Sequence, residues 1–208
     1  MHKLKVFGLA ALAVFALTAV SASAAQAAPL FHVEEAPATI TGEQIGTQVF
    51  NTEEGKVECK VAKFTGTSNV TATATQELAP EYKECTAFGF VGATVNPEGC
   101  KYRFNLVEGS SPPTATVDVV CPSGQSIKVS TLSCVVSVGS QTGLSHAVFA
   151  NNGSGETRDL KVSVTVSGVA YTASSGCSKP GSFTNGTLNG EATVKADSGS
   201  SQQGLWVE

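Results

Sequence analysis

Apolar and polar residues alternate with a period of two through most of this chain. The alternation is clearest from Leu160 to Ser167, where Leu160, Val162, Val164 and Val166 are separated by polar residues. Side chains of a β-strand point alternately to the two faces of the sheet, so this segment predicts a strand with one buried face. Further strands are expected at 57–61, 100–106, 114–121, 125–130, 132–138, 144–150, 187–196 and 202–208.

The pattern predicts an all-β fold. Downstream of residue 27 no window shows apolar residues at helical spacing, and Val, Thr, Ser and Gly are abundant. About 12 to 14 short strands, separated by turn signals, have the spacing of a sandwich or barrel. We expect an antiparallel β-sandwich or jelly-roll-like domain over residues 28–208. A break at 108–113 is either a hairpin turn or a boundary between two subdomains, and we favour the hairpin.

The first 27 residues have the three parts of a cleavable signal peptide. Two lysines precede an apolar run from Val6 to Val20, and a segment rich in small residues with an A-x-A pattern ending at Ala27 follows. The run is shorter than the roughly 20 residues of a spanning helix, so we expect cleavage after Ala27 rather than a membrane anchor. The mature chain is then expected to be secreted or associated with the cell envelope, without a membrane span.

All six cysteines follow this leader, at Cys59, Cys85, Cys100, Cys121, Cys134 and Cys177. An even number of cysteines in an exported chain predicts disulfides. Six cysteines allow 15 pairings. A hairpin that turns near Pro112 would place Cys100 opposite Cys121, and proximity along the chain then suggests Cys59–Cys85 and Cys134–Cys177. Zinc ligation is disfavoured because no C-x-x-C or C-x-x-H spacing occurs.

Few residues suggest catalysis or metal binding. The segment from Gly143 to Ala147 has Ser145 at the position of a nucleophile elbow, but the residues after it predict a strand instead of the helix that an elbow requires. His32 with its neighbouring glutamates is a weak metal-ligand set near the start of the mature chain, and the acidic residues are not spaced as in a calcium loop. We therefore predict no catalytic residue, no metal site and no cofactor.

Two aromatic residues, Phe88 and Phe90, share one face of the segment 87–92. We expect them to be core residues. The alternative is that they are exposed and contact a ligand, by stacking on a sugar or by packing against a partner.

The segment Cys85–Val95, with the sequence CTAFGFVGATV, and the closing Gly-Leu-Trp-Val-Glu resemble secreted, β-rich proteins of high-GC Gram-positive bacteria that have no known function. The resemblance would cover most of the mature chain. It implies a structural framework and carries no activity or site residue with it.

Charge and composition restrict the function. The formal net charge is −4. Loss of the leader would remove the positive charges of Lys3 and Lys5 and make the net charge more negative. No basic cluster is present, so nucleic acid is not an expected partner. We expect a non-catalytic binder of a glycan, a wall polymer or another protein. The alternatives are an extracellular polysaccharide hydrolase, for which a cleft with paired carboxylates would be needed, and a structural surface component. The oligomeric state is left open.

Overall fold

The computed structural model describes residues 27–208, so the predicted signal peptide lies almost wholly outside the described residues. The all-β prediction is confirmed, since helical structure in this part of the chain is limited to one 3-10 turn at Gly155–Thr157. None of the helical structure found there is long and apolar enough to cross a membrane.

Fifteen strands are present among the described residues, and the longest has 18 residues, so several strands are longer than the sequence pattern predicts. The strands are β1 (Phe31–Val33), β2 (Ala38–Thr52), β3 (Gly55–Ser68), β4 (Ala72–Thr73), β5 (Thr75–Ala87), β6 (Val91–Asn96), β7 (Lys101–Val107), β8 (Thr114–Val120), β9 (Ile127–Ser130), β10 (Val135–Val138), β11 (Gln141–Asn152), β12 (Asp159–Ala173), β13 (Gly181–Ser198), β14 (Ser201–Gln203) and β15 (Leu205–Val207).

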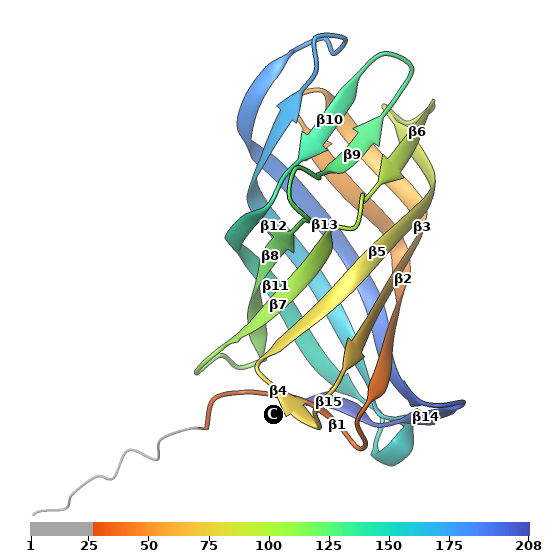
Figure 1. Ribbon diagram of the computed structural model, residues 1–208, viewed down its shortest axis with the longest axis vertical. Helices are drawn as coiled ribbons and strands as arrows, with labels where there is room; N and C mark the ends of the chain where they lie inside the picture. The colour runs from red at the N-terminus through yellow and green to blue at the C-terminus, as the bar shows by residue number, and fades with distance from the viewer. Residues whose placement is uncertain (1–26) are drawn as a thin grey trace, which may run out of the picture.

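The main sheet closes into a barrel, which corrects the expected sandwich or jelly-roll (Figure 1). Eight strands follow one another around it in chain order, each antiparallel to the next: β2, β3, β5, β7, β8, β11, β12 and β13. The last strand, β13, pairs with both β12 and β2, and this closes the ring. A period of two describes a strand with one buried face in a sandwich and in a barrel alike, so the pattern could not distinguish them.

The upper end of the barrel is built from a partly different set of strands. At its start β5 pairs with β7, and at its end, from Cys85 to Ala87, it pairs with β6. In the same way β12 pairs first with β11 and later with β10. The strands β6, β9 and β10 therefore replace β7, β8 and β11 at the top of Figure 1, and the barrel stays closed along its length.

Three disulfides join Cys59 to Cys85, Cys100 to Cys121, and Cys134 to Cys177, the same pairs that the sequence analysis expects. The first joins directly opposed residues of β3 and β5. The second joins the residue just before β7 to the residue just after β8, and these strands form a hairpin with residues 108–113 as its turn. Three disulfides indicate an oxidising environment.

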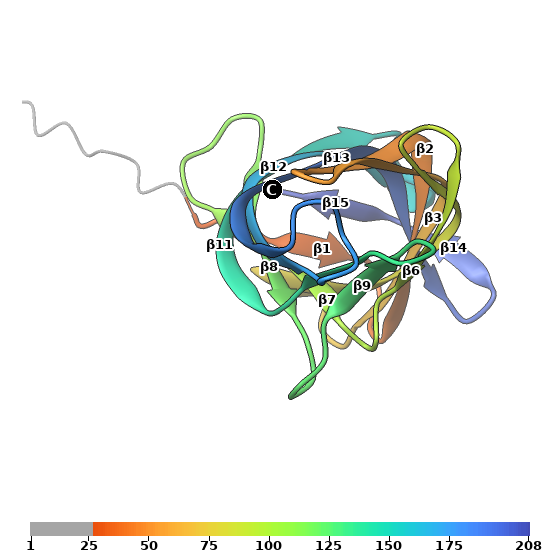
Figure 2. The ribbon, with the colours of Figure 1, turned by 90° about the horizontal axis from the view of Figure 1, so that it is seen from above.

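A separate three-stranded sheet of β15, β1 and β4 closes the lower end of the barrel. Figure 2 shows β1 and β15 lying across the ring when the barrel is viewed along its length. The Phe31 ring packs edge-on against Phe149 of β11 at 5.2 Å, and Phe149 packs against Phe104 of β7 at 6.0 Å. Asn151 makes two hydrogen bonds of 2.9 Å to the backbone of Val207. Aromatic packing and hydrogen bonds thus hold this cap in place.

Candidate ligand-binding cavity

The interior of the barrel contains two apolar cavities. The lower one has a volume of ≈ 60 Å³ and lies against the cap, between residues such as Phe31, Phe104 and Leu205. The upper one has a volume of ≈ 70 Å³ and is lined by residues such as Phe50 and Val129. Five residues line both cavities, which places the two cavities side by side: Gln48, Tyr82, Tyr102, Val117 and Leu188.

The inward faces of the long strands supply the apolar lining. In β12 the four residues expected to face inward do so: Leu160, Val162 and Val164 line the lower cavity and Val166 the upper. The lining of the lower cavity also includes small residues of β13, namely Gly190 and Ala192, which fill little of the interior.

Three polar residues lie in the wall that the two cavities share, and a fourth, Gln76, lines the lower cavity alone. The Tyr82 and Tyr102 hydroxyl oxygens are 2.9 Å apart and share a hydrogen bond, and Tyr102 is only 8% exposed. Gln48 is 6% exposed, and its Nε2 donates to the Glu191 carbonyl at 3.1 Å. We call Gln48, Tyr82 and Tyr102 the polar wall.

An irregularity in β2 precedes Gln48, whose side chain points inward. The register of β2 against β3 shifts between Glu43 and Gln48, and Gly46 within this bulge has a φ of 73°. On the neighbouring strand β13, a Cβ on Gly190 would overlap the Gln48 amide. The absence of a side chain at position 190 therefore makes room for the Gln48 side chain. The bulge and the glycine together accommodate a buried polar side chain in a mainly apolar interior.

Both tyrosines of the polar wall are neutral at physiological pH. Burial raises the pKa of Tyr82 well above its ordinary value of 10.0, and the neighbouring Tyr102 raises it further. Burial also raises the pKa of Tyr102, although its hydrogen bond with Tyr82 acts in the opposite direction. The two hydroxyls therefore act as neutral hydrogen-bonding groups and are poorly suited to acid–base catalysis near neutral pH.

The lining offers apolar contact rather than charge. The one charged residue that contributes to either cavity is Glu191, and its carboxylate is bonded to Lys161 at 3.0 Å and to Ser163 at 3.0 Å on β12. A concave, mostly apolar space with a few convergent polar atoms is the arrangement typical of small-molecule sites.

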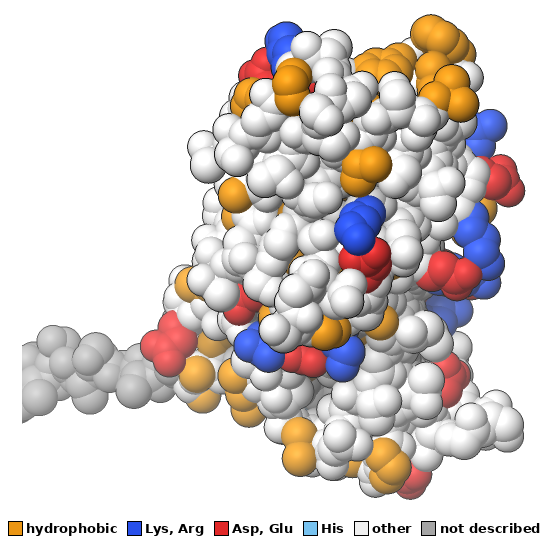
Figure 3. Space-filling model, turned by 45° about the horizontal axis from the view of Figure 1, so that its top comes forward, with side chains coloured by type: hydrophobic (Ala, Val, Ile, Leu, Met, Phe, Trp, Pro, Cys, Tyr) orange, Lys and Arg blue, Asp and Glu red, His pale blue; other side chains and the backbone are white. Residues whose placement is uncertain are grey.

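At the upper end of the barrel, loops expose apolar side chains. Phe90 is 83% exposed and Leu132 is 98% exposed, and Figure 3 shows apolar side chains at the top of the molecule. Phe88 is 47% exposed and its ring lies over Gly55 in the turn between β2 and β3. The expectation that Phe88 and Phe90 belong to the core is therefore wrong. They lie in the tight turn from β5 to β6, where Phe88 has a φ of 56° and the strand alternation that suggested burial is interrupted.

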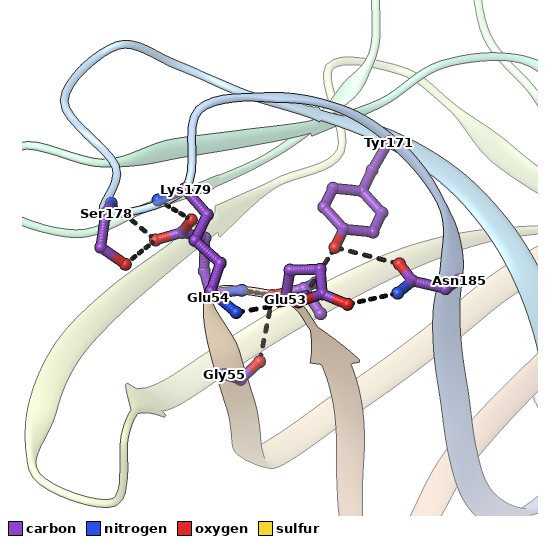
Figure 4. A network of polar contacts seen from close by, with 8 residues as sticks. Glu53, Glu54, Gly55, Tyr171, Ser178, Lys179 and Asn185 are labelled. Atoms are coloured by element: carbon purple, nitrogen blue, oxygen red, sulfur yellow. Dashed lines mark hydrogen bonds and ion pairs between the residues drawn. The ribbon is translucent and has the colours of Figure 1, made fainter.

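A polar network at the same end ties the β2–β3 turn to the β12–β13 loop (Figure 4). The Glu54 carboxylate accepts hydrogen bonds from the Ser178 N–H and hydroxyl, both at 2.8 Å, and from the Lys179 N–H at 2.5 Å. The Glu53 carboxylate accepts from Lys179 Nζ at 3.0 Å and from Asn185 at 2.6 Å.

These bonds determine how both glutamates titrate. Burial raises the pKa of Glu54, but the hydrogen bonds from Ser178 and Lys179 outweigh this effect, and its pKa lies below the ordinary value of 4.5. The hydrogen bond and charge of Lys179 and the hydrogen bond from Asn185 also lower the pKa of Glu53. A glycosidase needs one carboxylic acid with a raised pKa, so this pair is not suited to glycoside hydrolysis.

The structure does not bring the other candidate residues together into a catalytic or metal site. Ser145 lies within β11, next to a bulge, and the residues after it form the expected strand rather than the helix that an elbow requires. His32 stacks on Trp206 with ring centroids 5.1 Å apart. A cluster of Glu54 with Cys134 and Cys177 has the spacing of metal ligands, but the two sulfurs are joined in a disulfide and are not available as thiolates.

The alternation in the sequence does not predict the polar wall, for an identifiable reason. Tyr102 shares its inward face with Cys100 and Phe104, and this alternation was visible in the sequence. Tyr82 lies on the same parity of β5 as the buried Leu78, whereas Cys85, three residues further along, is buried on the opposite parity. The change of face coincides with Glu84, whose φ is 52°. A residue type that favours left-handed backbone angles would have indicated this change of face in the sequence. Glutamate is not such a residue type.

Comparison with known proteins gave no assignment, since no family model, no curated protein and no solved structure matches the chain.

Proposed function

We propose that this protein is a secreted, non-catalytic binding protein that holds a small apolar molecule inside its barrel. The observation that carries the proposal is the pair of adjoining apolar cavities of ≈ 60 and ≈ 70 Å³. Well-packed interiors leave few voids larger than a water molecule, so two such voids side by side are unusual. The predicted signal peptide and the three disulfides support a location outside the cytosol.

The size of the cavities indicates the size of the ligand. An engineered protein cavity of roughly 150 Å³ with an apolar lining binds benzene. Each cavity here is about half that size, so the two together suit a molecule of about the size of benzene. Burial of such a molecule would stabilise the complex through lost apolar surface, with little dependence on salt.

The test is a titration of the oxidised protein with benzene, followed by isothermal calorimetry and by the melting temperature. We expect binding to the wild type and loss of about tenfold or more in affinity in Val117→Leu, because Val117 lines both cavities and a larger side chain would fill them. The matched control is Val120→Leu, which enlarges a residue of the same strand that lines neither cavity.

Unchanged affinity in Val117→Leu, or no binding to the wild type, would contradict the proposal. The Val120→Leu control is expected to bind benzene as the wild type does, so a loss shared by both variants would point to a general effect on stability.

A second candidate function is binding of a glycan, a wall polymer or another protein at the upper end of the barrel. The exposure of Phe90 and Leu132 favours it, since apolar side chains at loop tips are available for stacking and docking. It is tested by a binding screen of wild-type protein and of Phe90→Ser against purified wall polymers and glycans. If the wild type and Phe90→Ser bind a polymer equally well, or if neither protein binds any of them, the result counts against this surface.

A further inference from the structure

The polar wall has an unused hydrogen-bond donor. Each tyrosine hydroxyl has one hydrogen, and the hydrogen bond between Tyr82 and Tyr102 uses one of the two. Neither hydroxyl makes another hydrogen bond within residues 27–208 beyond this one. One O–H donor therefore remains in a wall that borders both cavities.

A donor left without an acceptor in an apolar interior is costly, and buried polar groups in folded proteins nearly always have partners. Gln48 does not supply the acceptor, because no hydrogen bond joins its Oε1 to either hydroxyl, and its Nε2 donates to Glu191 of β13. A molecule in the cavity that carries an acceptor atom would complete the set of hydrogen bonds.

The lining also restricts the charge of that molecule. No side chain of Lys, Arg, His or Asp lines either cavity, and Glu191 is bonded to Lys161. An unpaired charge in such a space would be strongly disfavoured, so the ligand must be neutral. Because burial keeps the two hydroxyls protonated, the donor is present at neutral and at mildly alkaline pH.

We infer that the ligand is a neutral, mainly apolar molecule with one hydrogen-bond acceptor, such as a carbonyl or ether oxygen, that accepts the spare hydrogen of the Tyr82–Tyr102 pair. This inference rests on the proposed function and specifies its ligand class. Since the polar wall borders both cavities, the acceptor atom lies near the middle of the ligand, with apolar parts on either side.

The experiment compares two probes of the same shape, cyclohexanone and methylenecyclohexane, which differ in whether C=O or C=CH₂ is present. Affinities of both are measured for wild type, Tyr82→Phe, Tyr102→Phe and the double variant. We expect the ratio of ketone affinity to alkene affinity to fall by about two- to tenfold in the double variant, which has no hydroxyl. Each single variant keeps one hydroxyl with a free hydrogen, so at least one of them retains the wild-type ratio.

The outcomes separate the two proposals. If methylenecyclohexane binds but the ratio is the same in the wild type and in the double variant, the inferred acceptor is wrong while the binding function stands. Loss of the preference in both single variants would also overturn it, because a spare hydrogen would survive in each. If neither probe binds the wild type, the proposed function itself fails.

A second measurement does not depend on the variants. The infrared carbonyl stretch of cyclohexanone bound to the wild type should lie below its value in an alkane solvent, as a hydrogen-bonded carbonyl does. A stretch equal to the alkane value would overturn the inference even if the double variant does not fold.

Discussion

Single residues determine whether a polar group can be placed inside the barrel. Gln48 reaches the interior because β2 bulges before it and because position 190 has no side chain. Its one hydrogen bond to Glu191 compensates in part for burial. The pair Gln48 and Gly190 therefore depends on close contact between two strands, β2 and β13, that also close the ring.

The first prediction concerns this contact. We expect Gly190→Ala to lower the free energy of unfolding by about 1–3 kcal/mol, because the new methyl group must displace the Gln48 amide. Urea denaturation measures the change. Gly92→Ala is the matched control, since a Cβ at this position in β6 would meet no atom within 4 Å, and we expect little change from it.

Combining Gly190→Ala with Gln48→Ala checks the cause. The double variant should lose less stability than the sum of the two single changes, because the clash disappears with the amide. Strict additivity would show that the two residues do not interact as described.

At the scale of elements, contacts between the β2–β3 turn and the β12–β13 loop stabilise the upper end of the barrel. The β2–β3 turn supplies both glutamates, and the β12–β13 loop supplies the donors Ser178 and Lys179 (Figure 4). Cys177 anchors the same loop to Cys134, just before β10. The loop is thus fixed by a covalent bond on one side and by charge-assisted hydrogen bonds on the other.

The second prediction is that Glu54→Gln loosens this loop while the barrel remains folded. The change removes the negative charge and one acceptor oxygen, so the amides of Ser178 and Lys179 should exchange with solvent about tenfold faster. Hydrogen exchange followed by NMR measures this effect. The control is Glu43→Gln, whose partner Lys63 lies 3.3 Å away in an exposed pair, and such pairs contribute little.

The pH dependence of the wild type should show the same effect. Because hydrogen bonds hold the pKa values of Glu53 and Glu54 below 4.5, their stabilisation is present above that value and is lost as the pH falls through the lowered values. Exchange at Ser178 that stays equally slow at every pH below 4.5 at which the barrel is still folded, after correction for the intrinsic rate, would contradict the assigned contacts.

Local sequence pattern predicts many strands well and fails at identifiable points. The predicted inward face of 160–166 and the hairpin around 108–113 are both present in the structure. The strand expected at 132–138 begins only at Val135, and Leu132 lies exposed in a bend before it. Turns and face switches such as those at Phe88 and Glu84 depend on backbone angles that the apolar pattern does not record.

For the whole molecule, the disulfides join residues of the barrel that lie far apart in the sequence. They close segments of 26, 21 and 43 residues, and the loop-entropy relation gives about 3–4 kcal/mol for each. Their combined effect is then roughly 10 kcal/mol, which is comparable with the whole stability of an ordinary domain.

The third prediction is therefore that full reduction unfolds the barrel, whereas loss of one bridge does not. We expect dithiothreitol with alkylation of the thiols to abolish the β-sheet circular dichroism signal at 25 °C. The Cys100→Ser/Cys121→Ser variant should remain folded, with its free energy of unfolding lowered by about 3 kcal/mol. A fully reduced protein with an unchanged spectrum and melting temperature would show that the apolar core alone suffices.

The amino-acid sequence alone determined the class of the fold, the inward faces of most strands and the expected cysteine pairs, because these depend on alternation and on neighbours along the chain. Closure into a barrel was decided only by the tertiary structure, since it requires β13 to pair with β2 near the opposite end of the chain. The cavity is likewise a tertiary property. Its volume is what remains after side chains from all around the ring have packed, and Tyr82 and Tyr102 meet there only because β5 and β7 are neighbours in the closed sheet.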